Sequence, residues 1–73
     1  MDKLTQRETE VLKLITMGFD NTEISRKMYI STHTVKAHIE HIYSKLGVHN
    51  RLQAVIKYLK QKSARKSNQN KKM

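Results

Sequence analysis

The sequence predicts an all-α protein, a small bundle of four helices followed by a basic tail. Three observations lead to this prediction. Apolar residues recur with helical spacing in four segments, each segment begins next to a residue that can cap a helix, and the chain has no proline and only 2 glycines. The chain has no proline that could interrupt a helix, so each helix must end through a capping residue.

Length and composition exclude several classes of protein. A chain of 73 residues forms one domain and buries too little apolar surface to enclose a deep catalytic cavity. We find no catalytic constellation and predict that the protein is not an enzyme. The absence of cysteine excludes disulfides and thiolate zinc sites, and no apolar run could span a bilayer or form a signal peptide. We therefore expect a cytoplasmic protein without a membrane partner.

The first two helices are predicted from their caps. Thr5 and Glu8 have the spacing of a capping box, so the first helix begins there and ends near Gly18. For the second helix, Asn21 is the favoured cap, and the helix runs to about Met28. A short link, 29–31, joins it to a third and longer helix. This layout is typical of a helix-turn-helix, here at about 20–39.

The third helix is predicted at about 32–46, between a Ser31 cap and Gly47. One face carries an apolar stripe, and the opposite face is polar apart from one methyl group. The stripe consists of Val35, Ile39, Ile42 and Leu46, and the polar face of His33, Lys36, Ala37, Glu40, His41 and Ser44.

The fourth helix is predicted to begin at Arg51, after an Asn50 cap. Its apolar set is wide enough to serve both the core and a partner subunit, and consists of Leu52, Val55, Ile56 and Leu59, with Ala54 and Tyr58 on a flank. The structured domain should therefore comprise residues 1–60. Residues 61–73 lack a large apolar residue before the final Met, and we expect a disordered basic tail.

The charge balance points to a polyanionic partner. Lys and Arg number 15 against 6 acidic residues, a net charge of +9, and Glu40 is the last acid in the chain. Charge alone leaves nucleic acid, acidic membranes and non-specific adhesion open.

The third helix favours DNA among these partners. The major groove of B-DNA admits one α-helix. Ala37 would allow close approach, Lys36 can donate to guanine, and Glu40 can accept from cytosine or turn away. Hydroxyls and free N–H groups at the helix start (Ser31, Thr32, His33 and Thr34) suit a phosphate, and the preceding helix opens similarly at Asn21 and Thr22.

The four histidines raise the question of a metal. His38 and His41 are three residues apart, but no cysteine and no third inward ligand supports a site. We predict no metal and no cofactor, with His38 as a partly buried packing residue.

The chain resembles the LuxR/FixJ-type helix-turn-helix, also called the GerE-type domain, over about residues 3–60. The resemblance is carried by Leu4-Thr5-x-Arg7-Glu8-x-Glu10-Val11-Leu12, Gly18, Asn21-x-Glu23-Ile24, Ile30-Ser31-x-x-Thr34-Val35-Lys36-x-His38-Ile39, Lys45-Leu46-Gly47-Val48 and Asn50-Arg51-x-x-Ala54.

The resemblance implies a sequence-specific bacterial transcription factor that binds double-stranded DNA as a homodimer, located at the nucleoid, with RNA polymerase as a further candidate partner. It implies base reading by Lys36, Ala37 and Glu40, and a structural ion pair between Glu8 and Arg51. Phosphate contacts would come from Thr22, Ser31, Thr32, His33, Thr34, Lys45 and His49. The dimer would form through the last helix, at Leu52, Ala54 and Tyr58.

Two positions depart from the family pattern, and other functions stay open. Ser25 replaces a small apolar residue where the two motif helices cross, and Glu40 stands where many members carry a basic or neutral residue. No receiver or ligand-binding module accompanies the motif. The chain is then a stand-alone regulator or the excised effector domain of a response regulator. An anti-activator of the same fold and a non-specific coating protein are the alternatives.

Overall fold

The structure is a computed structural model that describes the backbone of residues 3–70 and the side chains of residues 3–61. The elements in chain order are α1 (Gln6–Thr16), α2 (Asn21–Met28), α3 (Thr32–Leu46) and α4 (Arg51–Asn70). Within the described residues there is no β-strand. The predicted all-α class is confirmed.

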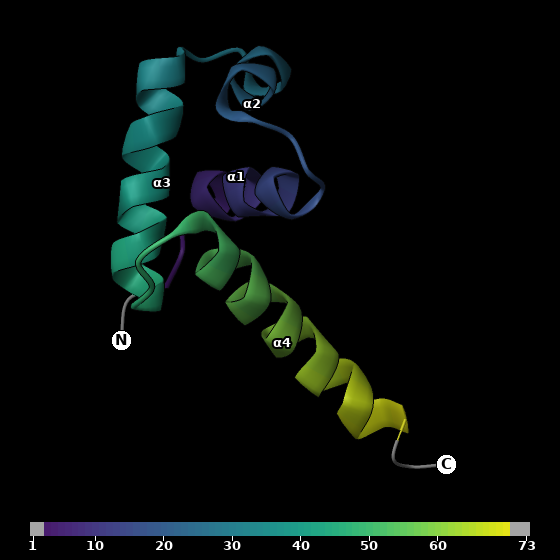
Figure 1. The fold of residues 1–73 in the computed structure, drawn as a ribbon. Coiled ribbons are helices and arrows are strands. Elements are labelled where there is room, and N and C mark those ends of the chain that lie inside the picture. The colour runs from purple at the N-terminus through teal and green to yellow at the C-terminus, as the bar shows by residue number, and fades with distance from the viewer. Residues whose placement is uncertain (1–2, 71–73) are drawn as a thin grey trace.

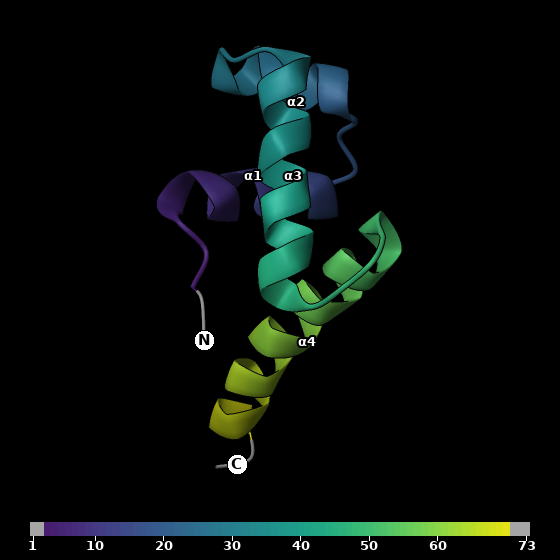
Figure 2. The same ribbon diagram turned by 90° about the vertical axis from the view of Figure 1, so that its left-hand side faces the viewer.

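Helices α1 and α3 form the centre of the bundle. Each of them contacts all three other helices. In Figures 1 and 2, α1 crosses the middle of α3, α2 lies at its N-terminal end, and α4 starts beside its C-terminal end and runs away from it. One side of α3 is therefore covered along its length, while Figure 2 shows no other segment in front of its opposite side.

The core lies where the four helices meet. Each helix contributes at least one buried apolar side chain. Three residues of the predicted α3 stripe are buried, and the fourth, Leu46, is half-buried against the core. The buried residues are Val11, Leu12, Ile15, Ile24, Met28, Val35, Ile39, Ile42 and Ala54. The helical spacing of these residues in the sequence is what places them on inward faces.

Three of the predicted caps, at Thr5, Ser31 and Asn50, are confirmed by their hydrogen bonds. The Glu8 backbone N–H donates to the Thr5 hydroxyl at 3.1 Å, and the Thr5 N–H donates to a Glu8 carboxylate oxygen at 2.9 Å. The Thr34 N–H donates to the Ser31 hydroxyl at 3.0 Å. The Gln53 N–H donates to the Asn50 side-chain oxygen at 2.9 Å. Gly47 ends α3 in the left-handed conformation, with φ of 71°.

The predicted cap of α2 is wrong by one residue. Asp20, not Asn21, is the N-cap: its carboxylate accepts from the Glu23 N–H, and its own N–H donates to the Glu23 carboxylate, each at 2.8 Å. Only Asp20 has an acidic residue three positions later, so only Asp20 can form both halves of a capping box.

The link between α2 and α3 contains a non-glycine residue with positive φ. Tyr29 closes α2 in the left-handed conformation, with φ of 59° and ψ of 43°, and is 94% exposed. Glycine usually occupies such a position, because a Cβ atom there costs free energy. The Ile30 N–H then donates to the Ser25 carbonyl at 3.0 Å.

The predicted boundary at residue 61 differs from the structure, because α4 continues through Asn70. Residues 61–70 contain no Pro or Gly, and Lys, Arg, Gln and Ala are all favourable in helices. The lack of large apolar residues in this segment argues against burial in a core, but it does not prevent α4 from continuing as a helix. The remainder of the predicted tail, residues 71–73, lies outside the described residues.

Candidate nucleic-acid interface

The predicted base-reading residues share the outward side of α3. Lys36 and Glu40 are exposed and Ala37 is half-buried, whereas Val35, Ile39 and Ile42 are buried on the opposite side. Neither Lys36 nor Glu40 forms an ion pair with another described residue. Both side chains are thus available to an external partner on the face that no other helix covers (Figure 2).

The N-terminal turn of α3 presents hydroxyl and N–H groups. The Ser31 and Thr34 hydroxyls lie 3.0 Å apart and form a hydrogen bond, while Thr32 and His33 are exposed. The first N–H groups of an α-helix have no partner inside the helix, and the helix dipole is positive there. This turn can accept an anion such as a phosphate.

The other two predicted backbone-contacting positions outside α3 are exposed as well. Thr22 lies in the first turn of α2, and its carbonyl accepts a hydrogen bond from the Ser25 hydroxyl at 2.7 Å. Ser25 stands where the family pattern has a small apolar residue, and its side chain is buried. Because of this hydrogen bond, the buried Ser25 hydroxyl is not left unpaired. His49 lies in the link to α4, where its N–H donates to the Gln53 side chain at 2.8 Å.

Lys45 is placed differently from the other predicted phosphate contacts. Its ammonium group donates to Glu8 Oε1 at 2.8 Å and to the Lys3 carbonyl at 3.3 Å. The Lys45 side chain is only 23% exposed, and the Glu8 side chain only 5%. Lys45 therefore joins the end of α3 to the start of α1, a partner that the sequence did not reveal.

The environment of Glu8 favours its charged form. The hydrogen bond from Lys45 lowers the pKa of the Glu8 carboxyl, and the Thr5 N–H and the charges of Lys45 and His41 act in the same direction. Burial raises the pKa but does not outweigh them. His41 Nδ1 lies 3.8 Å from Glu8 Oε2, so a second α3 residue faces this carboxylate.

The ion pair expected between Glu8 and Arg51 is not formed. The Arg51 guanidinium donates instead to the Asn21 side chain, at 3.1 Å, and to the Phe19 carbonyl. Glu8 faces the C-terminal half of α3, whereas Arg51 opens α4 beside the link between α1 and α2. Arg51 therefore holds this link and the N-terminal end of α2 against α4.

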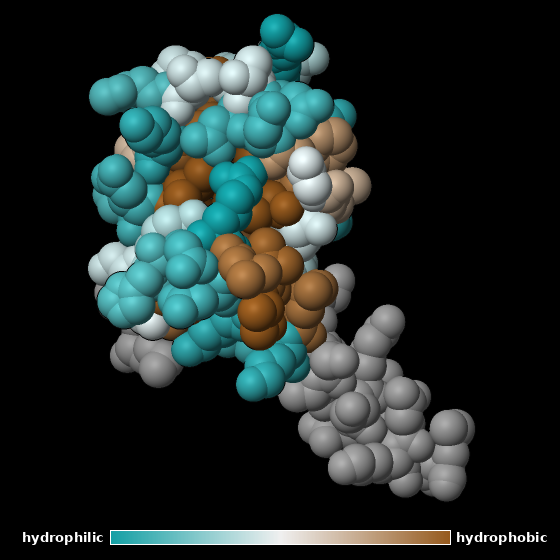
Figure 3. Space-filling model, in the orientation of Figure 1, coloured by the Kyte–Doolittle hydropathy of each residue, from teal (hydrophilic) through white to brown (hydrophobic). Residues whose placement is uncertain are grey.

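The predicted dimer surface on α4 needs one correction. Ala54 is fully buried in the core of the monomer and cannot be part of an exposed surface, and Tyr58 is half-buried against the same core. Leu52, Ile56 and Leu59 are 68%, 47% and 50% exposed, with one-turn and two-turn spacing. Figure 3 shows apolar surface over this part of α4. The spacing of this α4 stripe could have identified Ile56 and Leu59 from the sequence.

The described part of the chain contains neither a metal-binding cluster nor a membrane-spanning helix. No three residues of the types His, Cys, Asp and Glu come together there in a metal-binding cluster, and His38 is half-buried. None of the described helices has the length and hydropathy that crossing a bilayer requires.

Comparison with protein families matches residues 2–58 to the model described as bacterial regulatory proteins, luxR family. Among curated relatives, the transcriptional regulatory protein DegU of Brevibacillus brevis is 47% identical over 57 residues, 78% of this chain and 24% of the relative. The response regulator protein VraR of Staphylococcus aureus is 49% identical over 55 residues, 75% of this chain and 26% of the relative. The chain thus spans about a quarter of the length of these relatives.

Solved structures with the same fold are also found. The response regulator ChrA of a heme-sensing two-component system superposes with a TM-score of 0.80 at 42% identity, covering 85% of this chain and 31% of that one. The RcsB response regulator of Salmonella typhimurium gives a TM-score of 0.75 at 35% identity, covering 82% of this chain and 29% of that one.

Proposed function

Since the chain belongs to the luxR family of bacterial regulatory proteins and is a DNA-binding transcription regulator domain, not a member of an enzyme family, we propose that it binds specific duplex sites as a dimer. In this proposal α3 enters the major groove. The observation that carries it is the outward side of α3, opposite the buried stripe, where Lys36 and Glu40 are exposed without an ion pair to any described residue and Ala37 lies half-buried beside them.

Each of the three base-reading residues has a distinct role in this proposal. Lys36 donates to O6 and N7 of a guanine, and Ala37 lets the helix approach and contacts a thymine methyl. Glu40 accepts from N4 of a cytosine, which compensates the cost of a carboxylate near phosphates. One helical turn separates Lys36 from Glu40, so the two read neighbouring base pairs.

Contacts to the phosphate backbone orient the domain without reading sequence. We assign them to the first turns of α2 and α3 and to the link before α4, that is, to Thr22, Ser31, Thr32, His33, Thr34 and His49. Lys45 contributes in a different way, because its ammonium already binds Glu8. Its charge adds to the local potential, while its main role is to fix the end of α3 on α1.

The dimer in this proposal forms through the α4 stripe of Leu52, Ile56 and Leu59, with Tyr58 beside it. Exposed apolar side chains at helical spacing on one face support such a contact. A twofold dimer would place two copies of α3 about one helical turn of DNA apart, so the site should be a pseudo-palindrome. We place this action in the bacterial cytoplasm, at the nucleoid, where transcription by RNA polymerase would be regulated.

Selection of bound sites from a random duplex pool tests the proposal. We expect an enriched motif with twofold symmetry, bound at least about 10³-fold more tightly than a scrambled duplex at matched salt. Equal affinity for both duplexes with a steep salt dependence would instead identify a non-specific coating protein. No binding to any duplex would favour an anti-activator that uses this fold to pair with another regulator.

A further inference from the structure

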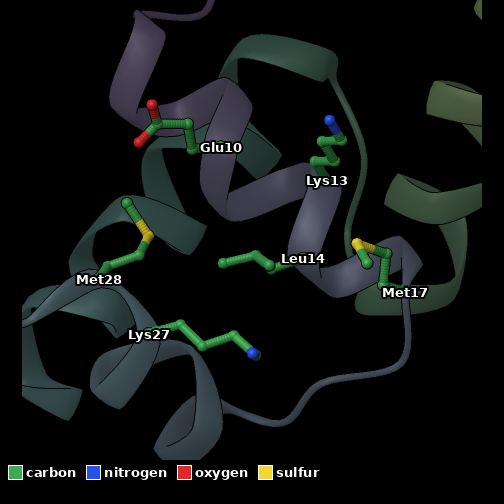
Figure 4. Close-up of a pocket in the computed structure, with 6 residues that line it drawn as sticks. All are labelled: Glu10, Lys13, Leu14, Met17, Lys27 and Met28. Atoms are coloured by element: carbon green, nitrogen blue, oxygen red, sulfur yellow. The ribbon is translucent and has the colours of Figure 1, made fainter.

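A shallow groove lies between α1 and α2, on a part of the surface to which the proposed function gives no role. Its volume is about 390 Å³. Leu14 and Lys27 extend into the gap from opposite sides in Figure 4. The groove is lined by Glu10, Lys13, Leu14, Met17, Lys27 and Met28.

The groove lies away from the candidate DNA-binding face. On α1, Val11, Leu12 and Ile15 are buried in the core, and the groove residues of α1 occupy other positions around the helix. No residue of α3 lines the groove. A molecule could therefore occupy it while α3 is in contact with DNA.

The chemistry of the groove combines apolar side chains with a positive rim. Leu14 and Met28 pack against the core, and Met17 is 61% exposed at the edge. Methionine side chains adapt to the shape of a partner, which is why they are common at binding surfaces. A partner that covers Met17 would remove apolar surface from water.

The charges on the rim are unequal. The Glu10 carboxylate lies 3.5 Å from the Arg7 guanidinium and is thereby compensated. The Lys27 ammonium lies 4.6 Å from the centre of the Phe19 ring, a cation–π contact that does not neutralise its positive charge. No acidic group among the described residues pairs with Lys13 or Lys27. The rim thus presents two uncompensated cations beside an apolar floor.

We propose that this groove docks an amphipathic helical segment of a partner protein that carries acidic residues beside its apolar face. Two or three apolar side chains of the segment would lie over Leu14, Met17 and Met28, with carboxylates toward Lys13 and Lys27. This is a recognised mode of helix-in-groove binding. DNA binding by α3 would continue while the segment is bound.

The charge and the open shape of the groove argue against three other kinds of ligand. The α4 stripe of a second copy is flanked by the exposed Lys57 and Lys60, so its charges would repel those of the groove rim. Nucleic acid could meet the lysines of the rim, but its charged backbone would leave the apolar side chains of Leu14, Met17 and Met28 without an apolar partner. A small molecule would leave much of its surface in water, because the groove is open, whereas such ligands are usually mostly buried.

Selection from a displayed library of random peptides tests the proposal on the full chain. We expect enriched peptides with apolar residues at i, i+3 or i+4, and i+7, flanked by Asp or Glu. Met17→Gln and Lys27→Glu should each weaken binding of an enriched peptide at least tenfold. The matched changes on α4, Leu52→Gln and Lys57→Glu, should leave it within about twofold. Replacing the peptide carboxylates by Lys should restore binding to the Lys27→Glu variant.

Titration of the enriched peptide into isotope-labelled protein, followed by NMR, locates the site. Amide shifts should concentrate in α1 and α2, both with and without duplex DNA. No enrichment, enriched peptides without acidic residues, displacement by DNA, or loss of binding only in the α4 variants would each overturn the proposal. The peptide measurement without DNA is independent of duplex binding, so its failure and the failure of the proposed function are distinguishable.

Discussion

The Lys45 ammonium, in the last turn of α3, lies 2.8 Å from a Glu8 carboxylate oxygen in the first turn of α1, across 37 positions of the sequence. The same ammonium donates to the Lys3 carbonyl. One side chain thus fixes the C-terminal end of α3 relative to α1 and the N-terminal segment. In the proposed function, where α3 reads DNA, the same contact also holds the base-reading side chains at defined positions.

Removing the ammonium should destabilise the fold. Lys45→Met keeps the aliphatic stem but leaves a buried carboxylate without its main partner. We expect the free energy of unfolding to fall by about 1–3 kcal/mol, less than for a wholly buried pair because Lys45 is partly exposed. Urea unfolding measures the change. Lys36→Met serves as the control and should alter stability little; an equal loss in both variants would contradict the assigned role of Lys45.

Stability should also fall in acid through Glu8. Its pKa in the folded state is lowered from its ordinary value of 4.5, so folding favours the charged carboxylate. The resulting stabilisation is present above pH 4.5 and is lost as the pH falls through the folded pKa. Unfolding free energies measured from pH 6 downward should decline less steeply in Glu8→Gln. This difference should shrink in the Lys45→Met background, because Lys45 is the main cause of the shift.

Tyr29 offers a way to stabilise the protein. Its left-handed backbone costs about 1–2 kcal/mol in a residue with a Cβ atom, and its side chain is almost wholly exposed. Tyr29→Gly should therefore raise the unfolding free energy by about 0.5–1 kcal/mol, after the larger chain entropy of glycine is subtracted. Tyr29→Ala, which keeps the Cβ atom, is the matched control. Thermal unfolding of both variants separates relief of backbone strain from loss of the aromatic ring.

The sequence was sufficient for the features that depend on short spacing. The stripe of Val35, Ile39 and Ile42 defines the buried side of α3, and the caps at Thr5 and Ser31 follow from side chains three residues from their partners. These features are local because a helix repeats its contacts every three or four residues. The cap at Asp20 follows the same spacing, because Glu23 lies three residues later.

Contacts between helices could not be read in the same way. Glu8 and Arg51 are opposite in charge, but which cation meets Glu8 depends on the angle at which α3 crosses α1. That geometry brings Lys45 to Glu8 and turns Arg51 toward Asn21. Likewise, the helical pattern of α4 predicts an apolar side, but it does not tell which of the apolar residues are buried in the core and which are exposed. Ala54 belongs to the core, whereas Leu52 does not.

Lys36 should affect discrimination between sequences more than overall affinity. If it donates to a guanine, Lys36→Ala should cost about 1–3 kcal/mol on the preferred site and relax the preference at one base pair of each half-site. Thr32→Ala should instead weaken preferred and scrambled duplexes by similar factors, because a phosphate contact carries no sequence information. Titration of both variants against both duplexes at fixed salt gives the comparison. If Lys36→Ala weakened binding to both duplexes by the same factor, Lys36 would contact the DNA phosphate backbone and not a base.

The exposed α4 stripe should control pairing without controlling folding. Leu52 and Leu59 are each at least half exposed, so Leu52→Asp with Leu59→Asp should keep the monomer folded. The carboxylates would be desolvated in a dimer, and affinity for a duplex with two half-sites should fall at least tenfold, while affinity for a single half-site stays similar.

Sedimentation velocity with labelled duplexes reports both stoichiometry and affinity for this variant. Met17→Asp, which changes an exposed apolar residue beside the α1–α2 groove, is the control and should leave pairing on DNA intact. Ala54→Leu gives the opposite contrast, because a larger side chain in a fully buried position should cost about 1–3 kcal/mol of stability. Two protomers on a two-half-site duplex with the double Asp variant would place the dimer contact elsewhere than on the α4 stripe.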